Sequence, residues 1–234
     1  RLAGIFWEPR PVFADLADRP RWLVPILLLT VLTLAYLISF SRIVGWDTYL
    51  EQQMSRRTQA GERLAQLSPE QREVVMDAQI KVVRVMAYVS GVLGVAGSAL
   101  AVAAVLLGVF RLFGGVSIRF RQVFSIVSYS FLPSGLKTIL SLLVLFLKDP
   151  ADFNLTNPLP SNPGFFLDPS GASAWMRTLA TAADVFTIWV LLLAALGLSA
   201  AAGKKMTFGR ALWLVLLPWL AFTLGSAALA AAFA

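Results

Sequence analysis

The stretch WMRTLATAADVFTIWVLLLAALGLSAAA, residues 175–202, decides the fold. It is almost entirely apolar and is long enough to cross a bilayer as one helix, which takes about 20 residues. One carboxylate, Asp184, lies inside it. A charged side chain at the centre of a membrane helix costs about 2.5–3.5 kcal/mol on insertion scales, so we expect Asp184 to meet a partner or a wet cavity.

Polar residues follow one another at helical spacing around this carboxylate. Arg177, Thr181 and Asp184 stand at i, i+4 and i+7, which predicts one polar stripe that faces other helices of the bundle. The alternative is a shallow position for Asp184, because the uncharged run 185–202 covers about 27 Å by itself. The sequence leaves both positions open.

The composition is that of a membrane protein. Hydrophobic residues make up 58% of the 234 residues and charged residues only 14%, far from the average soluble domain. Cysteine and histidine are both absent, which removes disulfides, thiolate catalysis and the usual zinc and iron sites. We expect no catalytic residue, metal or cofactor. The net charge of +7 lies beside apolar segments, so it indicates the lipid bilayer as a partner and not nucleic acid.

Five long apolar segments predict an all-α membrane protein, a bundle of five transmembrane helices. We expect the spans at about residues 22–40, 82–110, 123–147, 175–202 and 211–233, within a five-helix membrane domain that covers 22–234. In residues 1–21, Val12, Phe13 and Leu16 share one helical face, which predicts a short amphipathic segment in the membrane interface. An ordinary structured tail is the alternative.

The second span begins before the membrane. Ser68, Pro69 and Gln71 provide a hydroxyl N-cap, a proline at the first helical position and the glutamine of a capping box, so one helix should start here and run into the span. Small residues gather within the span: Ser90, Gly91, Gly94, Gly97 and Ser98. They let another helix approach closely. We expect this helix to belong to the same chain.

Proline and hydroxyl residues mark the third span. Pro133 lies near its middle and should bend the helix, because proline leaves a carbonyl one turn earlier without its hydrogen bond. Ser130, Ser134, Lys137 and Ser141 form a stripe at i, i+4, i+7 and i+11, with an ammonium group among hydroxyls. Ser134 and Lys137 also match Ser-x-x-Lys, but no companion motif accompanies them, so a serine hydrolase is not favoured.

Basic residues indicate the orientation of the bundle. Five spans place the two termini on opposite sides of the membrane. The segments on the N-terminal side (1–21, 111–121 and 203–210) are short and basic, whereas acids roughly balance bases in the two long segments on the other side. The positive-inside rule therefore predicts a cytoplasmic N-terminus and a periplasmic or lumenal C-terminus.

The predicted topology brings two intramembrane charges to a similar depth. The third span ascends and the fourth descends, so Lys137 and Asp184 both lie in the outer half of the membrane, within reach of a long lysine side chain. We predict that they pair, with Ser134, Ser141 and Thr181 satisfying the remaining donors and acceptors. Such a pair either only fixes the arrangement of the helices or lines a polar cavity for an ion, a proton or a lipid headgroup.

The fourth span resembles a known family. Asp184, Phe186 and Trp189, followed by Leu196-Gly197-Leu198-Ser199 and a basic turn, are similar to the fourth-span signature of the Yip family. These are the Ypt/Rab-interacting integral membrane proteins, here in their bacterial branch. Further likeness lies in the opening (9–22), in the third-span region (114–133) and at Asn157 and Pro158 of the outer loop.

The resemblance implies a five-helix membrane domain with a cytoplasmic N-terminus. Eukaryotic members are implied to act in vesicle trafficking, by binding small GTPases or by shaping membranes as oligomers. The family offers no settled biochemical activity for bacterial members. We therefore expect a non-enzymatic protein that organises the membrane or its partners through the bundle, with a second copy or another membrane protein as a candidate partner.

A different function and a different location stay open. A small permease, an ion-coupled carrier or a lipid scramblase would use Lys137 and Asp184 as its pathway. Short loops and many alanine and arginine residues indicate a bacterial inner membrane. A Golgi or endoplasmic reticulum membrane is the alternative.

Overall fold

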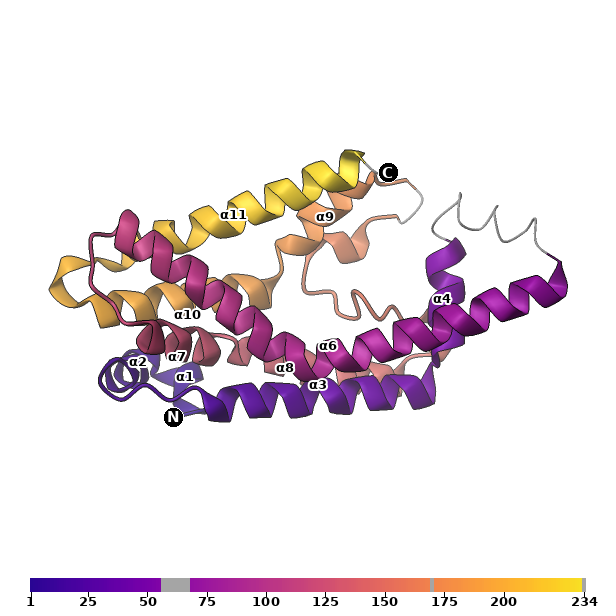
Figure 1. Ribbon diagram of the computed structural model, residues 1–234, viewed down its shortest axis with the longest axis horizontal. Coiled ribbons are helices and arrows are strands. Elements are labelled where there is room, and N and C mark those ends of the chain that lie inside the picture. Colours follow the sequence, from indigo (N-terminus) through magenta and orange to yellow (C-terminus); the bar gives the residue numbers. More distant parts are fainter. Residues whose placement is uncertain (56–67, 169–170, 233–234) are drawn as a thin grey trace.

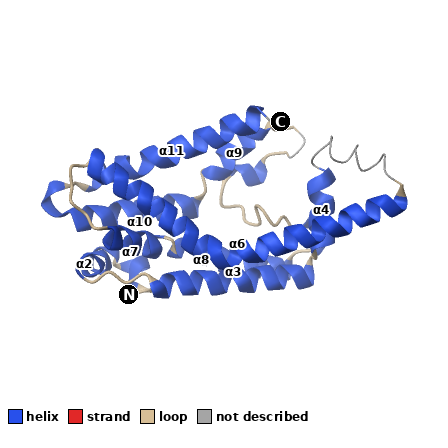
Figure 2. Cartoon of the chain, in the orientation of Figure 1, coloured by secondary structure: helices blue, strands red, loops and turns tan. Residues whose placement is uncertain are grey.

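The computed structural model describes residues 1–55, 68–168 and 171–232, whose regular elements are helices joined by loops (Figures 1 and 2). Among these described residues, five helical segments are long and apolar enough to cross a membrane. They comprise α3 (Leu23–Ile43), α6 (Pro69–Leu112), α7 and α8 together (Phe120–Ser130 and Leu132–Leu147), α10 (Val185–Ala202) and α11 (Phe208–Ala232). The predicted all-α, five-span architecture is confirmed. Phe233, at the end of the fifth predicted span, lies outside the described residues.

Shorter elements flank the spans. They are α1 (Gly4–Trp7), α2 (Pro9–Asp18), α4 (Trp46–Ser55), α9 (Ala174–Ala182) and the 3-10 turns η1 (Pro150–Asp152), η2 (Pro163–Phe166) and η3 (Gly203–Lys205). In Figure 1, α1, α2 and the loops after α6 and α10 gather toward one end of the long axis, and α4 lies toward the other. The chain starts near the first end, and its last helix, α11, runs toward the second.

The longest helix, α6, starts at the predicted N-cap. Ser68 Oγ accepts a hydrogen bond from the Gln71 backbone N–H, and the Gln71 side chain accepts one from the Ser68 backbone N–H, so the predicted capping box is confirmed. With 44 residues, α6 measures about 66 Å, twice the roughly 30 Å of a hydrocarbon core. Figure 1 shows it changing direction part-way, with contacts to α3 and α4 and also to α7 and α11.

The third span is two helices, α7 and α8, separated by Phe131. We expected Pro133 to bend one continuous helix. It lies instead in the first turn of α8, where its missing N–H breaks no helical hydrogen bond. Bonds from Phe131 N to Val127 O (3.1 Å) and from Ser134 N to Phe131 O (2.9 Å) bridge the junction, so the two helices cross as one segment.

The fourth predicted span, 175–202, is wrong as one continuous helix. α9 ends at Ala182 and α10 begins at Val185, with Asp184 as the N-cap of α10. The reason is that an aspartate side chain competes for nearby backbone N–H groups, which favours a helix start over a helix interior. The predicted stripe of Arg177, Thr181 and Asp184 does not run along one helix, because the first two residues belong to α9 and the third caps α10. α9 packs separately, against α11 and η2.

The N-terminal segment packs on the bundle. Val12, Phe13 and Leu16 are buried in a large apolar cluster that also contains residues of α6, α7, α10 and α11. A Cβ added to Gly197 of α10 would lie 2.7 Å from the Phe13 ring, so this glycine makes room for it. The apolar face that we expected to meet the membrane interface is therefore covered by protein.

The small residues of α6 meet two different environments. Gly91 is buried against α3, where an added Cβ would lie 2.8 Å from Leu37. At Gly94 and Gly97 an added Cβ would have nothing beyond its own helix within 4 Å. The bundle covers another side of this helix, which carries the buried residues Ala99, Ala103, Leu106 and Phe110. The expected packing within the chain is therefore wrong for Gly94 and Gly97.

Candidate functional site

Asp184 begins α10 and holds its first turn. Its Oδ1 atom accepts hydrogen bonds from the backbone N–H groups of Phe186 (3.0 Å) and Thr187 (3.3 Å). The first N–H groups of a helix have no partner inside the helix, and a carboxylate there also interacts favourably with the helix dipole. One oxygen of Asp184 is therefore used for capping.

The other oxygen of Asp184 meets three side chains. Oδ2 lies 2.9 Å from Nζ of Lys137 on α8, 2.5 Å from the Ser161 hydroxyl oxygen and 3.4 Å from the Asn162 amide nitrogen. The structure thus brings Lys137 and Asp184 together. Only 3% of the Asp184 side chain is exposed, against 32% for Lys137. Hydrogen bonds from five donors offset the cost of burying this carboxylate.

The loop between α8 and α9 supplies two of these donors. Asn157 and Asn162 bond each other twice, with amide nitrogen to oxygen distances of 2.8 and 3.1 Å, which orients Asn162. The Val185 N–H donates to the Ser161 carbonyl at 3.0 Å, so loop backbone also closes the break before α10. We refer to five residues as the Asp184 cluster: Lys137, Asn157, Ser161, Asn162 and Asp184.

The helix before the break, α9, is held against the same loop. A Cβ added to Gly164 would lie 2.4 Å from the Thr181 methyl carbon and 2.9 Å from the Thr181 backbone nitrogen, so a glycine is required there. Thr181 donates to the Arg177 carbonyl (2.8 Å), and Arg177 donates to the Ala172 carbonyl (2.9 Å). In place of the predicted bonds to the charged pair, these two side chains hold α9 and the turn that precedes it.

The serines of the predicted stripe make other contacts. Ser130 and Ser141 donate at 2.8 Å to carbonyls one turn earlier, those of Ile126 and Lys137. Ser134 lines the cavity described below. A hydroxyl that bonds its own helix is satisfied without a partner helix. The roles that we predicted for Ser134 and Ser141 belong instead to loop side chains.

The sequence prediction missed those loop residues, Ser161 and Asn162. Loops lack the periodicity that places residues on a common helical face, so spacing gives no warning of this contact. One signal was present: Ser161-Asn162-Pro163 follows Asn157-Pro158 closely, and serine or asparagine beside proline favours fixed turns with side-chain hydrogen bonds. Such turns present their donors in defined directions.

The Asp184 cluster lies at one end of a helix of membrane-spanning length. α10 has 18 residues, about 27 Å of helix, which nearly matches a hydrocarbon core of about 30 Å. Lys204 and Lys205 follow its other end. The shallow position of Asp184 is therefore favoured over one deep in the bilayer, and it explains how loop side chains reach the carboxylate.

A cavity of about 690 Å³ lies beside the cluster, between α3, α6, α7, α8, α10 and α11. Its wall is mostly apolar but includes several hydroxyl side chains: Thr33, Ser98, Ser130, Ser134, Thr138 and Thr187. Thr138 adjoins Lys137 in the sequence, and the Thr187 N–H bonds Asp184, so cluster and cavity share a wall. The described residues that line the cavity do not include Lys137 or Asp184.

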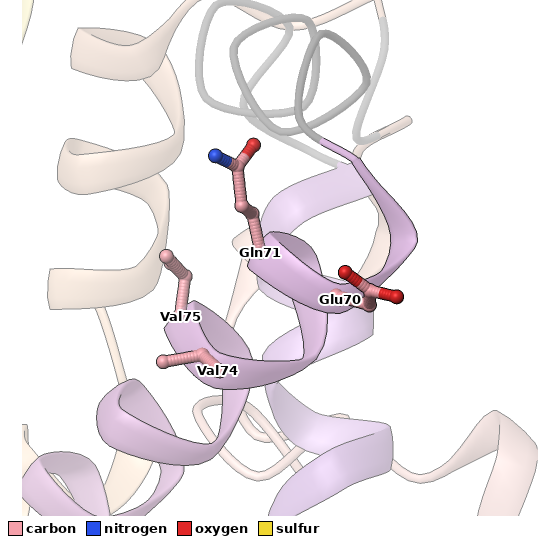
Figure 3. A pocket seen from close by; sticks show the side chains of 4 residues that line it. All are labelled: Glu70, Gln71, Val74 and Val75. Atoms are coloured by element: carbon pink, nitrogen blue, oxygen red, sulfur yellow. The ribbon is translucent and has the colours of Figure 1, made fainter.

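A second hollow, about 410 Å³, lies at the start of α6 and is lined by Glu70, Gln71, Val74 and Val75. Figure 3 shows that these side chains come from neighbouring turns of one helix and point in different directions. Within residues 1–55, 68–168 and 171–232, no three acidic, histidine or cysteine side chains are grouped to hold a metal ion. The Asp184 cluster, where several elements converge, is the stronger candidate site.

Comparison with known proteins identifies the family. The model of the Yip1 domain matches residues 3–229, nearly the whole chain. The chain belongs to the Yip1 domain family. No curated protein and no solved structure matches it. The family resemblance inferred from the sequence is therefore confirmed.

Two residues of the proposed family signature, Phe186 and Asn157, bond residues of the cluster in this Yip1 domain, and a third, Trp189, packs on the N-terminal segment. Phe186 gives its N–H to Asp184, and the Trp189 ring packs edge-on against Phe6 of α1, with centroids 5.5 Å apart. Asn157, which precedes Pro158, pairs with Asn162 of the cluster. The Yip1 match thus includes the N-terminal segment as well as the spans.

Proposed function

We propose that this Yip1 domain protein is not an enzyme and that it organises the membrane or partner proteins through its helical bundle. The observation that carries the proposal is an uncovered surface of α6. We call it the open face of α6, and it consists of Ser90, Gly94 and Gly97; Ser98 lies at its border with the cavity described above. Small residues at such spacing let a second helix backbone approach closely.

The exposure of α6 supports this choice of surface. In the most apolar stretch of α6, 17% of the residues are buried, against 22–33% in the corresponding stretches of the other four spans. Most of the helix therefore faces lipid or a partner. Small residues let the backbones of two membrane helices come close enough for extensive van der Waals contact. A partner helix therefore gains the most packing energy where the side chains of α6 are smallest.

The Asp184 cluster supports an organising role because it joins α8, α10 and a loop at one carboxylate. Buried ion pairs are better at specifying an arrangement than at adding stability. α8 packs on α3, and α3 packs on α6. We infer that the cluster fixes the bundle in the shape that presents the open face of α6.

The environment of Lys137 argues against catalysis by the Ser-x-x-Lys motif. A lysine that activates a serine must be neutral, so that it accepts the hydroxyl proton. The Lys137 ammonium instead donates to the carboxylate of Asp184 at 2.9 Å. Lys137 is thus held against Asp184 and not against Ser134.

Cysteine cross-linking tests the open face directly, because the chain has no cysteine of its own. Gly94→Cys and Gly97→Cys would be treated in native membranes with a short bis-maleimide. We expect cross-linked dimers or adducts with another membrane protein, identified by mass spectrometry. The matched control is Val31→Cys on α3, a position that is 61% exposed on a different helix.

The proposal fails if Gly94→Cys, Gly97→Cys and Val31→Cys cross-link to the same extent, or if none of them does. Equal cross-linking would indicate random collision in the membrane. Selective cross-linking at α6 identifies the partner as well as the surface. A product of twice the chain mass would indicate a homo-oligomer.

Orientation and location are part of the same proposal. We infer a cytoplasmic N-terminus, a periplasmic C-terminus and a bacterial inner membrane, with a Golgi or endoplasmic reticulum membrane as the alternative. The support is the basic character of the short segments that join one set of helix ends. In intact cells, an impermeant maleimide should label Lys148→Cys and not Lys205→Cys; the reverse pattern would overturn the orientation.

A second candidate function is a permease, an ion-coupled carrier or a lipid scramblase. The observation in its favour is that a third of the Lys137 side chain is exposed (32%) next to a cavity. Proteoliposome assays of ion flux and lipid scrambling would compare the natural protein with Asp184→Asn. Flux that Asp184→Asn abolishes would favour this candidate over the organising role.

A further inference from the structure

The cavity beside the Asp184 cluster extends along the helices within the membrane. On α10 its lining residues run from Thr187 to Ala194, and on α11 from Val215 to Phe222. Each run covers about 10 Å at 1.5 Å per residue, roughly one third of a hydrocarbon core of about 30 Å. The cavity therefore starts just below the cluster and reaches toward the middle of the bilayer.

The wall of the cavity suits hydrocarbon better than water. Four of its hydroxyl groups already donate to backbone carbonyls of their own helices. They belong to Thr33, Ser98, Ser130 and Thr138. Their protons are therefore already used. An apolar cavity of about 150 Å³ stays dry and binds benzene, and this one, at about 690 Å³, is several times larger. A space of this size left empty would cost its lining atoms many dispersion contacts.

The side of the cavity between α6 and α11 is lined by exposed residues. Figure 1 shows these helices close together where α6 ends and α11 begins, and apart toward the C-terminus of α11. Lining side chains from both helices remain exposed: Val102 (38%), Val105 (51%) and Phe222 (75%). At this depth the surrounding solvent is the acyl chains of the bilayer, so the cavity opens into lipid.

The end of the cavity near the membrane edge is its polar end. Ser134 of α8 and Thr187 of α10 line it there, and Lys137, whose side chain is partly exposed, lies one helical turn from Ser134. A phospholipid has the same order of groups: an apolar chain, then ester oxygens, then an anionic phosphate at the membrane edge. An ammonium group has three N–H donors, and those of Lys137 that do not bond Asp184 can donate to that phosphate.

A transmembrane helix does not fit this space. Such a helix runs through the whole thickness of the bilayer and is about 10–12 Å across with its side chains. α6 and α11 contact each other and converge where α6 ends and α11 begins, which leaves no room there for a third helix between them. A single flexible chain that enters from the open end and the side meets no such obstacle.

We propose that the cavity binds one acyl chain of a membrane phospholipid, which enters between α6 and α11 and places its ester and phosphate groups at the level of Lys137. The lipid is a bound component with a defined position, unlike the exchanging lipid around the bundle. It fills the space between α6, α11 and the helices beneath them.

Photo-cross-linking in nanodiscs tests this proposal. The full chain would be reconstituted with a phosphatidylglycerol that carries a diazirine in its acyl chain, and labelled residues would be mapped by mass spectrometry. We expect the label on cavity residues of α6 and α11. Val102→Phe, which fills the cavity, should lower this labelling by at least about tenfold, equivalent to ~1.4 kcal/mol of binding. Val92→Phe, on the lipid-facing side of the same helix, is the matched control and should change nothing.

Ala101→Phe is a second filling variant, so that the test survives a folding defect in the first. Native mass spectrometry should find one retained phospholipid in the natural protein and in Val92→Phe, and none in the filled variants. The proposal is overturned if label spreads evenly over exposed residues of every span or if correctly folded filled variants keep their lipid. It is also overturned if a second polypeptide, instead of lipid, is lost on filling the cavity.

Discussion

Two helix breaks, one inside the third span and one just before the fourth, are satisfied in opposite ways. Between α7 and α8 the chain passes through Phe131, and backbone hydrogen bonds to nearby residues bridge the junction. Between α9 and α10 the break depends on Asp184, whose partners include Lys137, 47 positions away. The first interruption is satisfied locally, and the second is satisfied by tertiary structure.

The position of each break in the membrane explains this difference. Lipid supplies no hydrogen bonds, so backbone groups deep in the bilayer must be paired within the protein. The α7–α8 junction keeps its own ladder nearly complete. The break at Asp184 lies near the membrane edge, where loop residues are available as partners. Mutations should therefore cost far more at the second break than at the first.

The largest effect is expected for Asp184→Ala. It leaves the Lys137 ammonium unpaired and the N-terminus of α10 uncapped. Loss of a helix cap costs about 0.5–2 kcal/mol, and a buried donor left without its acceptor, such as the Asn162 amide, costs a further ~1–3 kcal/mol. The free energy of unfolding, measured by SDS titration in mixed micelles, should fall by this amount. Unchanged stability would show that the cluster does not hold the break together.

A second large effect is expected for Gly164→Val, which forces a side chain against Thr181. Overpacking of this kind costs about 1–3 kcal/mol. Hydrogen exchange should rise in α9 and in the loop. Gly225→Ala on α11 is the matched control, because an added Cβ there meets nothing within 4 Å. Equal loss of protection in both variants would contradict the close contact.

The third prediction separates the two roles of Asp184. The amide of Asp184→Asn still caps α10, so this variant loses only the ion pair with Lys137. Lys137→Met removes the same ion pair. The two changes combined should therefore lose less stability than the sum of the single changes, by about 1–3 kcal/mol. Lys137→Asp with Asp184→Lys should not recover, because lysine cannot cap a helix start. Rescue by this charge reversal would mean that capping is unimportant.

The smallest effect is expected at the first break. Ser130→Ala removes only a bond from a hydroxyl to the Ile126 carbonyl, and side-chain hydrogen bonds in membrane proteins average about 0.6 kcal/mol. The same SDS titration measures it. A loss comparable to that of Asp184→Ala would erase the contrast between the two interruptions.

The sequence was sufficient for what depends on topology and apolar length. Five spans and a capping box at Ser68 follow from residue type and order, and neighbouring antiparallel spans bring Lys137 near Asp184. The break at Asp184 did not follow, because one uninterrupted apolar pattern fits a continuous helix as well as a capped one. The difference depends on Ser161, whose contact with Asp184 is set by loop folding.

Packing surfaces were equally hard to predict. The spacing of Gly91, Gly94 and Gly97 identifies a helix suited to close contact, but it contains no information on which side the bundle covers. α3 covers Gly91 and leaves the other two uncovered. That choice depends on the path of α6, which changes direction along its length.

The way in which the N-terminal segment packs has a consequence for defining this protein's smallest folded piece. Phe13 fills the space above Gly197, and Ser125 of α7 bonds both the N–H (2.9 Å) and the carbonyl (2.7 Å) of Arg21. A fragment cut at the first membrane crossing would carry an aromatic-sized hole in its interior. The autonomous unit therefore starts upstream of that crossing, and any truncated version for expression should keep these residues.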